Sequence, residues 1–581
     1  MRILKGNPVS RGIALAKGYI YRAFKADVHE SYFEAGQEAV MYKQFTDAVA
    51  AAEAELNAIV ASLSAESPEK AKIFTAHIEI LKDEEVAEEV KDMIFSRRAM
   101  PDYAVDMVFS EFALLLEKAK DPLIAARSAD LRDVRNRVLR ILKGEKEQNL
   151  ANLREKVVVV AHDLLPSDTA TLDRAHVMGI ITEVGGATSH TAILARSYKI
   201  PAVLGVPEAT EIVKNGDMVI LDAIKGEVLL EPDRTTIAEY EIKLEEFLKS
   251  EKQSAEFLNR IPLVASGERF SVGLNIGTTE PDEGFKYVDF VGLFRTEIVY
   301  MESEHMPTED EQFAAYRKVL ANAMGNPVTL RTLDIGGDKS LRYLVLPKED
   351  NPFLGNRALR LCLDMPEMFK TQLRAALRAS AFGPMQIMFP MVGTMDDIRA
   401  GNAAVEEAKA ELRAEGIPFD EKINIGIMIE IPSIAMIADM AAKETDFASV
   451  GTNDLTQYLH AVDRMNPKLT NYYQSSSPAM FRILGRIFKE YNDAGKPISV
   501  CGELAGDPLA AIVLFGLGLR KFSMNASNIP HVKRTLSLFT LAETEQIAKK
   551  VQNLSTEAEV ITYLKAEVAK REQKPTTTTT K

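Results

Sequence analysis

Eight short apolar segments, separated by helical stretches, fill the second half of the sequence and constrain its fold more than any other feature. In order they are RFSVGLNIG, YVDFVGLFR, PVTLRTLD, QIMFPMV, INIGIMIE, DFASVGTND, PISVCGE and KFSMNAS. A strand that is followed by a helix returns to its sheet as a parallel neighbour, and eight such units close into a barrel. The pattern therefore predicts a (β/α)₈ barrel of the TIM type, which we place at residues 261–572.

The first 232 residues have a different pattern. Residues 1–22 are typical of a short pair of strands, and the segments VVVVAH, VMGIITEV, DMVILDA and GEVLLEP predict more strands within 146–232. Between these two parts, residues 23–145 contain few glycines, and apolar residues recur at helical spacing over 38–63, 70–94 and 128–144. The simplest organisation is an α/β domain of residues 1–22 and 146–232 with a helical bundle of residues 23–145 inserted into it.

Two further segments complete a multidomain α/β chain. Residues 233–260 are charged, with helical spacing, and predict a linker helix to the barrel. Residues 573–581, with the sequence KPTTTTTK at their end, are of low complexity and predict a disordered tail.

Composition excludes several classes of function. The net charge of −14 argues against nucleic acid as a partner, and no uncharged apolar run is long enough to insert into a membrane. Two cysteines, Cys362 and Cys501, form no disulfide framework, so we expect a cytoplasmic protein. Residues 23–145 hold 16 Lys and Arg against 24 Asp and Glu, or 16 − 24 = −8, which taken alone favours a solvated helical face.

A histidine follows a glycine turn in GGATSHTAILARSYKIPAV, which starts at Gly185. The preceding strand runs into this turn, Thr188 and Ser189 supply helix-capping hydroxyls, and TAILARS continues as a helix. His190 therefore lies at a helix N-terminus, where backbone N–H groups and the helix dipole favour an anion. The residues alone leave two readings open: a histidine that carries an anionic group, or one that caps the helix.

Polar side chains stand at the ends of five predicted barrel strands, where barrel enzymes place their active sites. Two carboxylates suit Mg²⁺, and arginines bind phosphate and carboxylate groups as bidentate forks. Each of these residues taken singly is as consistent with a structural rim residue, and the cysteine with a small core residue. As a set they predict a site for a small, multiply charged anion with a metal. The residues are Arg295, Arg331, Glu430, Asn453, Asp454 and Cys501.

Several motifs carry a resemblance to a known family. The histidine loop resembles the phosphohistidine loop shared by Enzyme I, pyruvate phosphate dikinase and phosphoenolpyruvate synthase. DIGGDK, NPFLGNRALR, GTNDLTQY, VDR and CGELAGD resemble, in order, the barrel of the Enzyme I family of the phosphoenolpyruvate:sugar phosphotransferase system. The resemblance covers residues 1–570, and it departs at Ala187, where the family commonly has arginine.

The resemblance implies a role for each matching residue. His190 becomes the phosphoryl acceptor, oriented by Thr169, and Cys501 becomes the acid that protonates enolpyruvate. Glu430 and Asp454 become ligands of Mg²⁺. The residues implied to bind phosphoenolpyruvate are Arg295, Arg331, Lys339, Arg357, Asn453 and Arg464.

The expected activity follows from these roles. We expect a phosphotransferase that moves the phosphoryl group of phosphoenolpyruvate to His190 and then to the histidine-containing phosphocarrier protein HPr, releasing pyruvate. The resemblance also implies that the carrier docks on the helical bundle and that the chain is a homodimer through its barrel. Two alternatives remain at this point. A synthase or dikinase needs a nucleotide-binding domain, for which the sequence has neither a P-loop nor room, and a regulatory relative that docks the carrier without turnover is supported only by Ala187.

Overall fold

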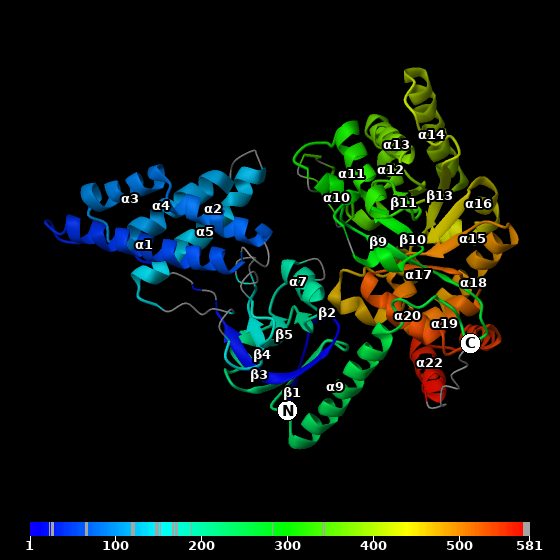
Figure 1. Cartoon of the computed structure of the whole chain (residues 1–581), viewed down its shortest axis with the longest axis horizontal. Helices are drawn as coiled ribbons and strands as arrows, with labels where there is room; N and C mark the ends of the chain where they lie inside the picture. The colour runs from blue at the N-terminus through cyan, green and yellow to red at the C-terminus, as the bar shows by residue number, and fades with distance from the viewer. Residues whose placement is uncertain are drawn as a thin grey trace. The chain divides into compact units, whose positions relative to one another are not determined.

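A computed structural model describes residues 1–572, except for 23, 25–27, 64–67, 118–121, 146–149, 151–152, 165–167, 169–171, 187–188, 282, 302, 338, 340, 342 and 345. The predicted tail at 573–581 lies outside the described residues. The chain divides into two compact units, Met1–Ser250 and Glu251–Lys581 (Figure 1). Each unit has hydrophobic cores of its own.

An eight-stranded sheet organises the first unit, in the order β1-β8-β7-β3-β4-β5-β6-β2. Strands β3 to β6 are parallel neighbours, so their carboxyl ends lie at one edge of the sheet. The strands of the first 22 residues do not pair with each other as predicted, because β1 pairs with β8, β2 with β6, and β3 with β4 and β7. The bounds are β1 Arg2–Lys5, β2 Asn7–Ser10, β3 Ile13–Tyr21, β4 Val157–Ala161, β5 Val177–Thr182, β6 Ala202–Leu204, β7 Met218–Asp222 and β8 Glu227–Leu230.

Five helices between β3 and β4 share one apolar core, which Phe45, Leu56, Phe74, Val90 and Val105 help to fill. The predicted continuous helix over 70–94 is wrong, because it is two helices. The break falls at Asp83, whose carboxylate accepts hydrogen bonds from the backbone N–H groups of Glu85 and Val86 and so begins a new helix. The sequence analysis also missed α4. The bounds are α1 Glu38–Leu63, α2 Pro68–Leu81, α3 Glu84–Arg97, α4 Pro101–Glu117 and α5 Pro122–Leu142.

Among the described residues of the first unit, three helices follow β5. α7 spans His190–Tyr198 and connects the neighbouring strands β5 and β6, whereas α8 spans Ala209–Ile212 and connects β6 to β7, which lie apart in the sheet. α9, Arg234–Ala255, is the predicted linker helix. Its Tyr240 donates a hydrogen bond to Asp222 at the end of β7, which ties the helix to the sheet.

The second unit is the predicted barrel. All eight predicted strands form, and each pairs in parallel with the next until β16 pairs with β9, which closes the barrel. The expected multidomain α/β fold class is confirmed. The bounds are β9 Ser271–Ile276, β10 Phe290–Arg295, β11 Val328–Arg331, β12 Met385–Phe389, β13 Asn424–Ile429, β14 Phe447–Val450, β15 Ile498–Val500 and β16 Lys521–Met524.

Helices surround the barrel and bury its outer face. One continuous apolar core joins strands and helices, and a smaller cluster of Leu293, Met388, Met428, Phe447 and Cys501 is buried apart from it. The helices are α10 Glu297–Met301, α11 Glu309–Asn322, α12 Leu359–Asp364, α13 Pro366–Ser380, α14 Met395–Glu415, α15 Pro432–Met436, α16 Ala438–Glu444, α17 Thr452–His460, α18 Pro478–Asp493, α19 Pro508–Gly516, α20 Ile529–Leu536, α21 Leu541–Val551 and α22 Glu557–Glu572.

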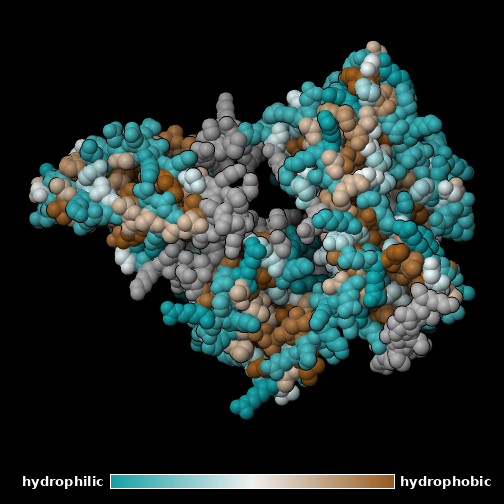
Figure 2. All heavy atoms as spheres, viewed as in Figure 1, coloured by the Kyte–Doolittle hydropathy of each residue, from teal (hydrophilic) through white to brown (hydrophobic). Residues whose placement is uncertain are grey.

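The visible face of each unit is largely hydrophilic, with smaller hydrophobic patches scattered over it (Figure 2). Ion pairs cover part of the barrel surface: Arg374 of α13 contacts Glu411 and Glu415 of α14. Across the described part of the chain, no helix combines the length and the apolar character that crossing a membrane requires.

Candidate active site

The carboxyl ends of the barrel strands gather the polar residues that the sequence singled out. Because the strands are parallel, their carboxyl ends share one end of the barrel. Arg295 and Arg331 close β10 and β11, Glu430 follows β13, and Cys501 follows β15. Asn453 and Asp454 lie in the first turn of α17, directly after β14.

Arg331 is buried between two carboxylates. Its Nη2 lies 2.5 Å from Glu297 Oε1, and its Nη1 lies 3.0 Å from Asp334 Oδ2. Burial alone would raise the pKa of Asp334, but the positive charges of Arg331, Lys339 and Arg357 outweigh it and hold that pKa well below its usual range. The carboxylate is therefore charged, and the guanidinium is fixed in one orientation.

Arg357 and Lys339 join the same network. Arg357 Nη2 lies 2.8 Å from Asp334 Oδ1, and Lys339 Nζ lies 2.7 Å from Glu297 Oε1. The chain reaches this arrangement through Gly336, whose φ of 106° is left-handed and whose missing Cβ would lie 2.6 Å from the Cβ of Arg357. Asp334 thus contacts three of the predicted cations, which are Arg331, Lys339 and Arg357.

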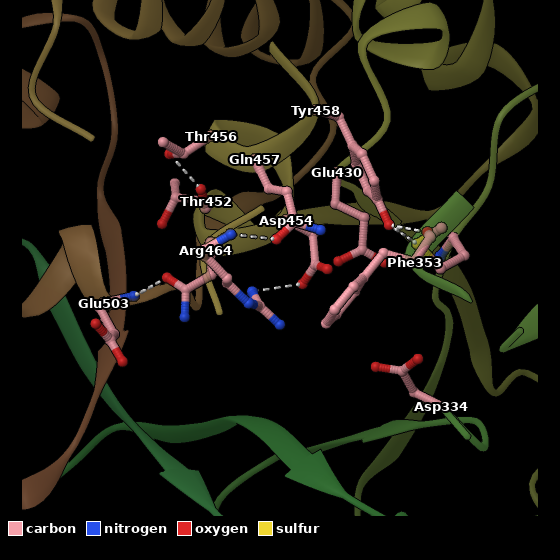
Figure 3. A network of polar contacts seen from close by, with 12 residues as sticks. Asp334, Phe353, Glu430, Thr452, Asp454, Thr456, Gln457, Tyr458, Arg464 and Glu503 are labelled. Carbon is pink, nitrogen blue, oxygen red and sulfur yellow. Dashed lines mark hydrogen bonds and ion pairs between the residues drawn. The ribbon is translucent and has the colours of Figure 1, made fainter. Parts of the chain in front are cut away.

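Asp454 links this network to α17 (Figure 3). Its two carboxylate oxygens lie 3.3 Å from Nη1 of Arg357 and 3.3 Å from Nη1 of Arg464. In Figure 3, Arg464 and Asp454 face each other, with Glu430 on the other side of Asp454. The Oδ1 atom of Asn453 accepts a hydrogen bond from the backbone N–H of Glu503 at 3.0 Å, which orients this side chain.

Glu430 is a fully buried carboxylate without a cation in contact among the described residues. Its Oε1 accepts a hydrogen bond from the backbone N–H of Met391 at 2.7 Å. Burial, followed by the negative charges of Asp454 and Asp334, raises the pKa of Glu430 to about 8. Gly451 leaves room for this side chain, because a Cβ there would lie 2.6 Å from Glu430 Oε2. A carboxylate in this position favours the approach of a positive charge.

Cys501 packs into the small apolar cluster inside the barrel and is 3% exposed. Its Sγ lies 3.7 Å from the carbonyl oxygen of Val450. Burial raises the pKa of the Cys501 thiol to about 11, while the nearby Ser449 and Arg331 act in the opposite direction. The group is consequently a protonated thiol at neutral pH.

Arg295 differs from the other arginines of the cluster. Its Cα pairs in register with that of Arg331, but its side chain is exposed. In the described part of the chain, Arg295 has no ion pair or hydrogen bond through its guanidinium. It is therefore a cation that is free to meet an anion from solution.

The second candidate centre is the histidine loop of the first unit. Gly185 has a φ of 105°, which permits the turn after β5, and Ser189 caps α7 by accepting a hydrogen bond from the backbone N–H of Ala192 at 3.2 Å. His190 is the first residue of α7, as predicted, so its backbone lies at a helix N-terminus. The side chain of His190, and Thr169, Ala187 and Thr188, lie outside what the structure describes.

The comparisons with known proteins agree along the whole chain. Models of three families match: "PEP-utilising enzyme, N-terminal" at residues 5–127, "PEP-utilising enzyme, mobile domain" at 153–226 and "PEP-utilising enzyme, PEP-binding domain" at 251–540. The phosphoenolpyruvate-protein phosphotransferases of Bacillus sp. (strain S) and Bacillus subtilis (strain 168) are each 42% identical to the chain. They cover 97% of it, and the chain covers 98% and 99% of theirs. The chain belongs to the phosphoenolpyruvate-protein phosphotransferase family.

A solved structure is also similar to the first part of the chain. The NMR solution structure of an Enzyme I protein is 40% identical, covers 42% of this chain and 99% of its own, and has a TM-score of 0.40. The sequence-based prediction of a phosphotransferase, rather than a synthase, a dikinase or a docking protein, is confirmed by the membership in the phosphoenolpyruvate-protein phosphotransferase family.

Sequence reasoning missed three residues that organise the barrel centre. Glu297 and Asp334 hold the cations in place, and Tyr458 donates a hydrogen bond to the carbonyl of Phe353 at 2.5 Å. The signal was available for Asp334, which is only three residues after Arg331, a predicted strand-end arginine. A carboxylate so close to a buried arginine in sequence is a candidate for its counter-ion.

A cavity of about 600 Å³ adjoins this network, and Phe353 and Tyr458 are among the residues that line it. Its remaining lining comes mainly from residues 350–354 and 457–463. None of the predicted substrate or metal residues lines it, so it is a neighbour of the charged centre and not the centre itself.

Proposed function

We propose that the chain transfers the phosphoryl group of phosphoenolpyruvate to His190 and from there to the phosphocarrier protein HPr, as the first step of sugar uptake by a phosphotransferase system. The observation that carries this proposal is the barrel centre, where buried carboxylates hold two arginines and a lysine at the carboxyl ends of the strands. Family membership supports the same reaction.

The arginines divide into two kinds, and each kind has a task. Arg331 and Arg357 are buried and already oriented by Asp334, so they bind the phosphate or carboxylate of the substrate without reorganising. Arg295 is exposed and contacts the substrate from the open side. Lys339, Asn453 and Arg464 complete the set, and phosphoryl transfer then needs mainly this positioning and charge neutralisation.

Magnesium fits the two carboxylates. Glu430 and Asp454 offer hard oxygen ligands, and Glu430 is a buried carboxylate that no cation contacts in the described residues. Burial and the charges of Asp454 and Asp334 raise the pKa of Glu430 to about 8 and so favour its neutral form, and a bound divalent cation would favour the carboxylate instead. When bound, Mg²⁺ would supply substrate coordination and neutralise charge on the transferring phosphoryl group.

Cys501 is the proposed acid for the second product. Loss of the phosphoryl group leaves enolpyruvate, which must gain a proton on carbon to become pyruvate. The raised pKa keeps the thiol protonated, and the proton that Sγ directs at the carbonyl of Val450 is the one it would give up.

The first unit provides the acceptor and the partner surface in this proposal. His190, oriented by Thr169, takes the phosphoryl group at the N-terminus of α7. The helical bundle at 23–145, with its charge of −8, is the docking surface for a basic face of the carrier. The α/β part comprises 1–22 and 146–232, and the linker at 233–260 lets it serve both the barrel at 261–572 and the carrier. A homodimer through the barrel and a cytoplasmic location complete the proposal.

The test is incubation of the full-length chain with ³²P-labelled phosphoenolpyruvate and Mg²⁺. We expect label that is stable in base and labile in acid, which is typical of phosphohistidine, and its transfer to added HPr. A chain that takes up no label while its barrel is folded and binds phosphoenolpyruvate would disprove the proposed reaction. Omission of Mg²⁺ should prevent labelling, and so should Glu430→Gln.

A further inference from the structure

A second histidine stands beside the loop that leads to His190. His162 follows β4 directly, and Glu183 follows β5 directly. The Nδ1 atom of His162 lies 2.6 Å from Glu183 Oε2. The other oxygen of Glu183 accepts hydrogen bonds from the backbone N–H and the hydroxyl of Thr210, at 2.8 Å and 2.5 Å. The imidazole is therefore bound to a carboxylate that is itself fixed.

This pairing determines what the ring offers to solvent. A carboxylate only accepts hydrogen bonds, so we assign the shared proton to Nδ1 of His162. Burial would raise the pKa of Glu183, but hydrogen bonds from Thr210 and His162 hold it below its usual range, and the group is charged. A ring that donates Nδ1–H to this carboxylate can donate to a second acceptor only through Nε2–H, so the doubly protonated ring is the form that binds an anion. The side chain of His162 is 65% exposed, and Nε2 has no partner among the described residues.

The backbone places His162 next to the phosphoryl acceptor. Its carbonyl oxygen accepts a hydrogen bond from the N–H of Val184, at the start of the glycine turn, at 3.2 Å. Two residues later, the carbonyl of Leu164 accepts a hydrogen bond from the hydroxyl of Thr191, in the first turn of α7, at 3.2 Å. Residues 162–164 are thus bonded to both ends of the loop that ends at His190. In open α/β sheets, ligands bind at this carboxyl edge of the parallel strands.

The loop itself lacks a cation. Between Arg174 and Arg196 the sequence contains neither lysine nor arginine, so this segment itself offers no permanent cation to a phosphoryl group on His190. We propose that His162, oriented by Glu183, binds the phosphoryl oxygens while the group passes between His190 and the carrier protein. His162 forms no covalent bond in this role, and the inference rests on the proposed function.

The test compares two substitutions at one position in the full-length chain. His162→Gln keeps a polar side chain but removes the cation, and His162→Arg restores a cation that Glu183 can still hold. We expect His162→Gln to lower the kcat of transfer to the carrier about fivefold, since an exposed charge contact contributes on the order of 1 kcal/mol. The KM for phosphoenolpyruvate should not change. His162→Arg should retain at least half of the wild-type rate, and Glu183→Gln should resemble His162→Gln.

A matched control exists at the opposite end of β5, the strand that Glu183 follows. The Nδ1 atom of His176 lies 2.7 Å from Asp173 Oδ2, but this pair precedes β5 and is therefore about 20 Å from the loop edge. His176→Gln removes the same chemical pair and should transfer at the wild-type rate. If His162→Gln matched His176→Gln, or if His162→Arg were as slow as His162→Gln, the proposal would be overturned. A wild-type chain that takes up no acid-labile phosphate would overturn the proposed function as well, and this is measured before any variant is compared.

Discussion

In the proposed reaction, the barrel centre and the histidine loop bind the same phosphoryl group, but the two sites differ in how far their side chains are buried. In the barrel, the side chains of Arg331, Asp334 and Arg357 are each at most 6% exposed, and every one of them contacts an opposite charge. At the loop, the neighbouring His162 is 65% exposed, and the capping Ser189 is only partly buried. The barrel binds charge by enclosing it, whereas the loop presents it.

The difference follows from what each site must meet. A small anion can be enclosed completely, and low dielectric then strengthens each contact with it. A phosphoryl group that is handed to another protein must remain accessible, so its support comes from backbone N–H groups and exposed side chains. Single substitutions should therefore cost several kcal/mol at the barrel centre and about 1 kcal/mol around the loop, except where the acceptor itself is removed.

The largest effect should come from that exception. His190→Ala removes the acceptor, so labelling by phosphoenolpyruvate should fall to background. Binding of phosphoenolpyruvate, measured by calorimetry, should be unchanged, because the binding residues belong to the barrel unit. Residual acid-labile label in this variant would mean that a residue other than His190 accepts the phosphoryl group. The histidine loop would then not be the second phosphoryl site.

The second effect concerns the buried thiol. Cys501→Ala removes a proton donor and no charge, so pyruvate formation should fall about 10²–10⁴-fold with little change in substrate affinity. Because burial raises the pKa of the thiol to about 11, iodoacetamide should react only slowly with Cys501 at pH 8. The two are measured by a pyruvate assay and by mass spectrometry. Turnover within about threefold of wild type would make Cys501 a packing residue of its apolar cluster.

The barrel strands and the residues at their ends could be predicted from the sequence, because both depend on local patterns. Apolar runs predict strands, and parallel strands bring their ends together whatever the side chains between them. Strand β6 was not predicted because it is only three residues long. The break at Asp83 was not predicted either, because there a helix cap interrupts a continuous helical pattern. Nor did the sequence reveal that Asp334 holds Arg357, since that contact depends on the turn at Gly336 and not on spacing.

A substitution of Asp334 tests the buried barrel centre. Asp334→Asn removes one buried carboxylate from both Arg331 and Arg357, which keep Glu297 and Asp454 as counter-ions, and this should destabilise the barrel by about 3 kcal/mol. It should also raise the KM for phosphoenolpyruvate by roughly tenfold, because the guanidiniums lose their orientation. Thermal unfolding and steady-state kinetics measure the two effects.

The pH dependence gives an independent check on this carboxylate. Its pKa is held below the ordinary value of 3.8, so its stabilisation is complete above that pH and is lost as the pH falls further. The acid limb of the unfolding curve should therefore be flatter in Asp334→Asn. Glu309→Gln is the control, since Glu309 contacts Arg374 and Arg378 away from the centre. Glu309→Gln should lose some stability and keep the wild-type KM for phosphoenolpyruvate. Equal KM values in the two variants would show that Asp334 does not position Arg331 and Arg357.

The smallest effect should come from the capping serine of the loop. Ser189→Ala removes the hydroxyl that accepts the N–H of Ala192, and loss of a helix cap costs about 1 kcal/mol. The carboxyl edge of the sheet and the rest of α7 remain, so labelling of His190 should slow by less than about tenfold, in line with that energy. Ser189→Asp, which can still cap, should recover the stability but not the rate, because its negative charge repels a phosphoryl group one residue away. The free energy of unfolding of the first unit and the rate of single-turnover labelling separate these two contributions. If Ser189→Ala lowered the free energy of unfolding as much as Asp334→Asn does, the loop would also bind its charged group in a buried environment.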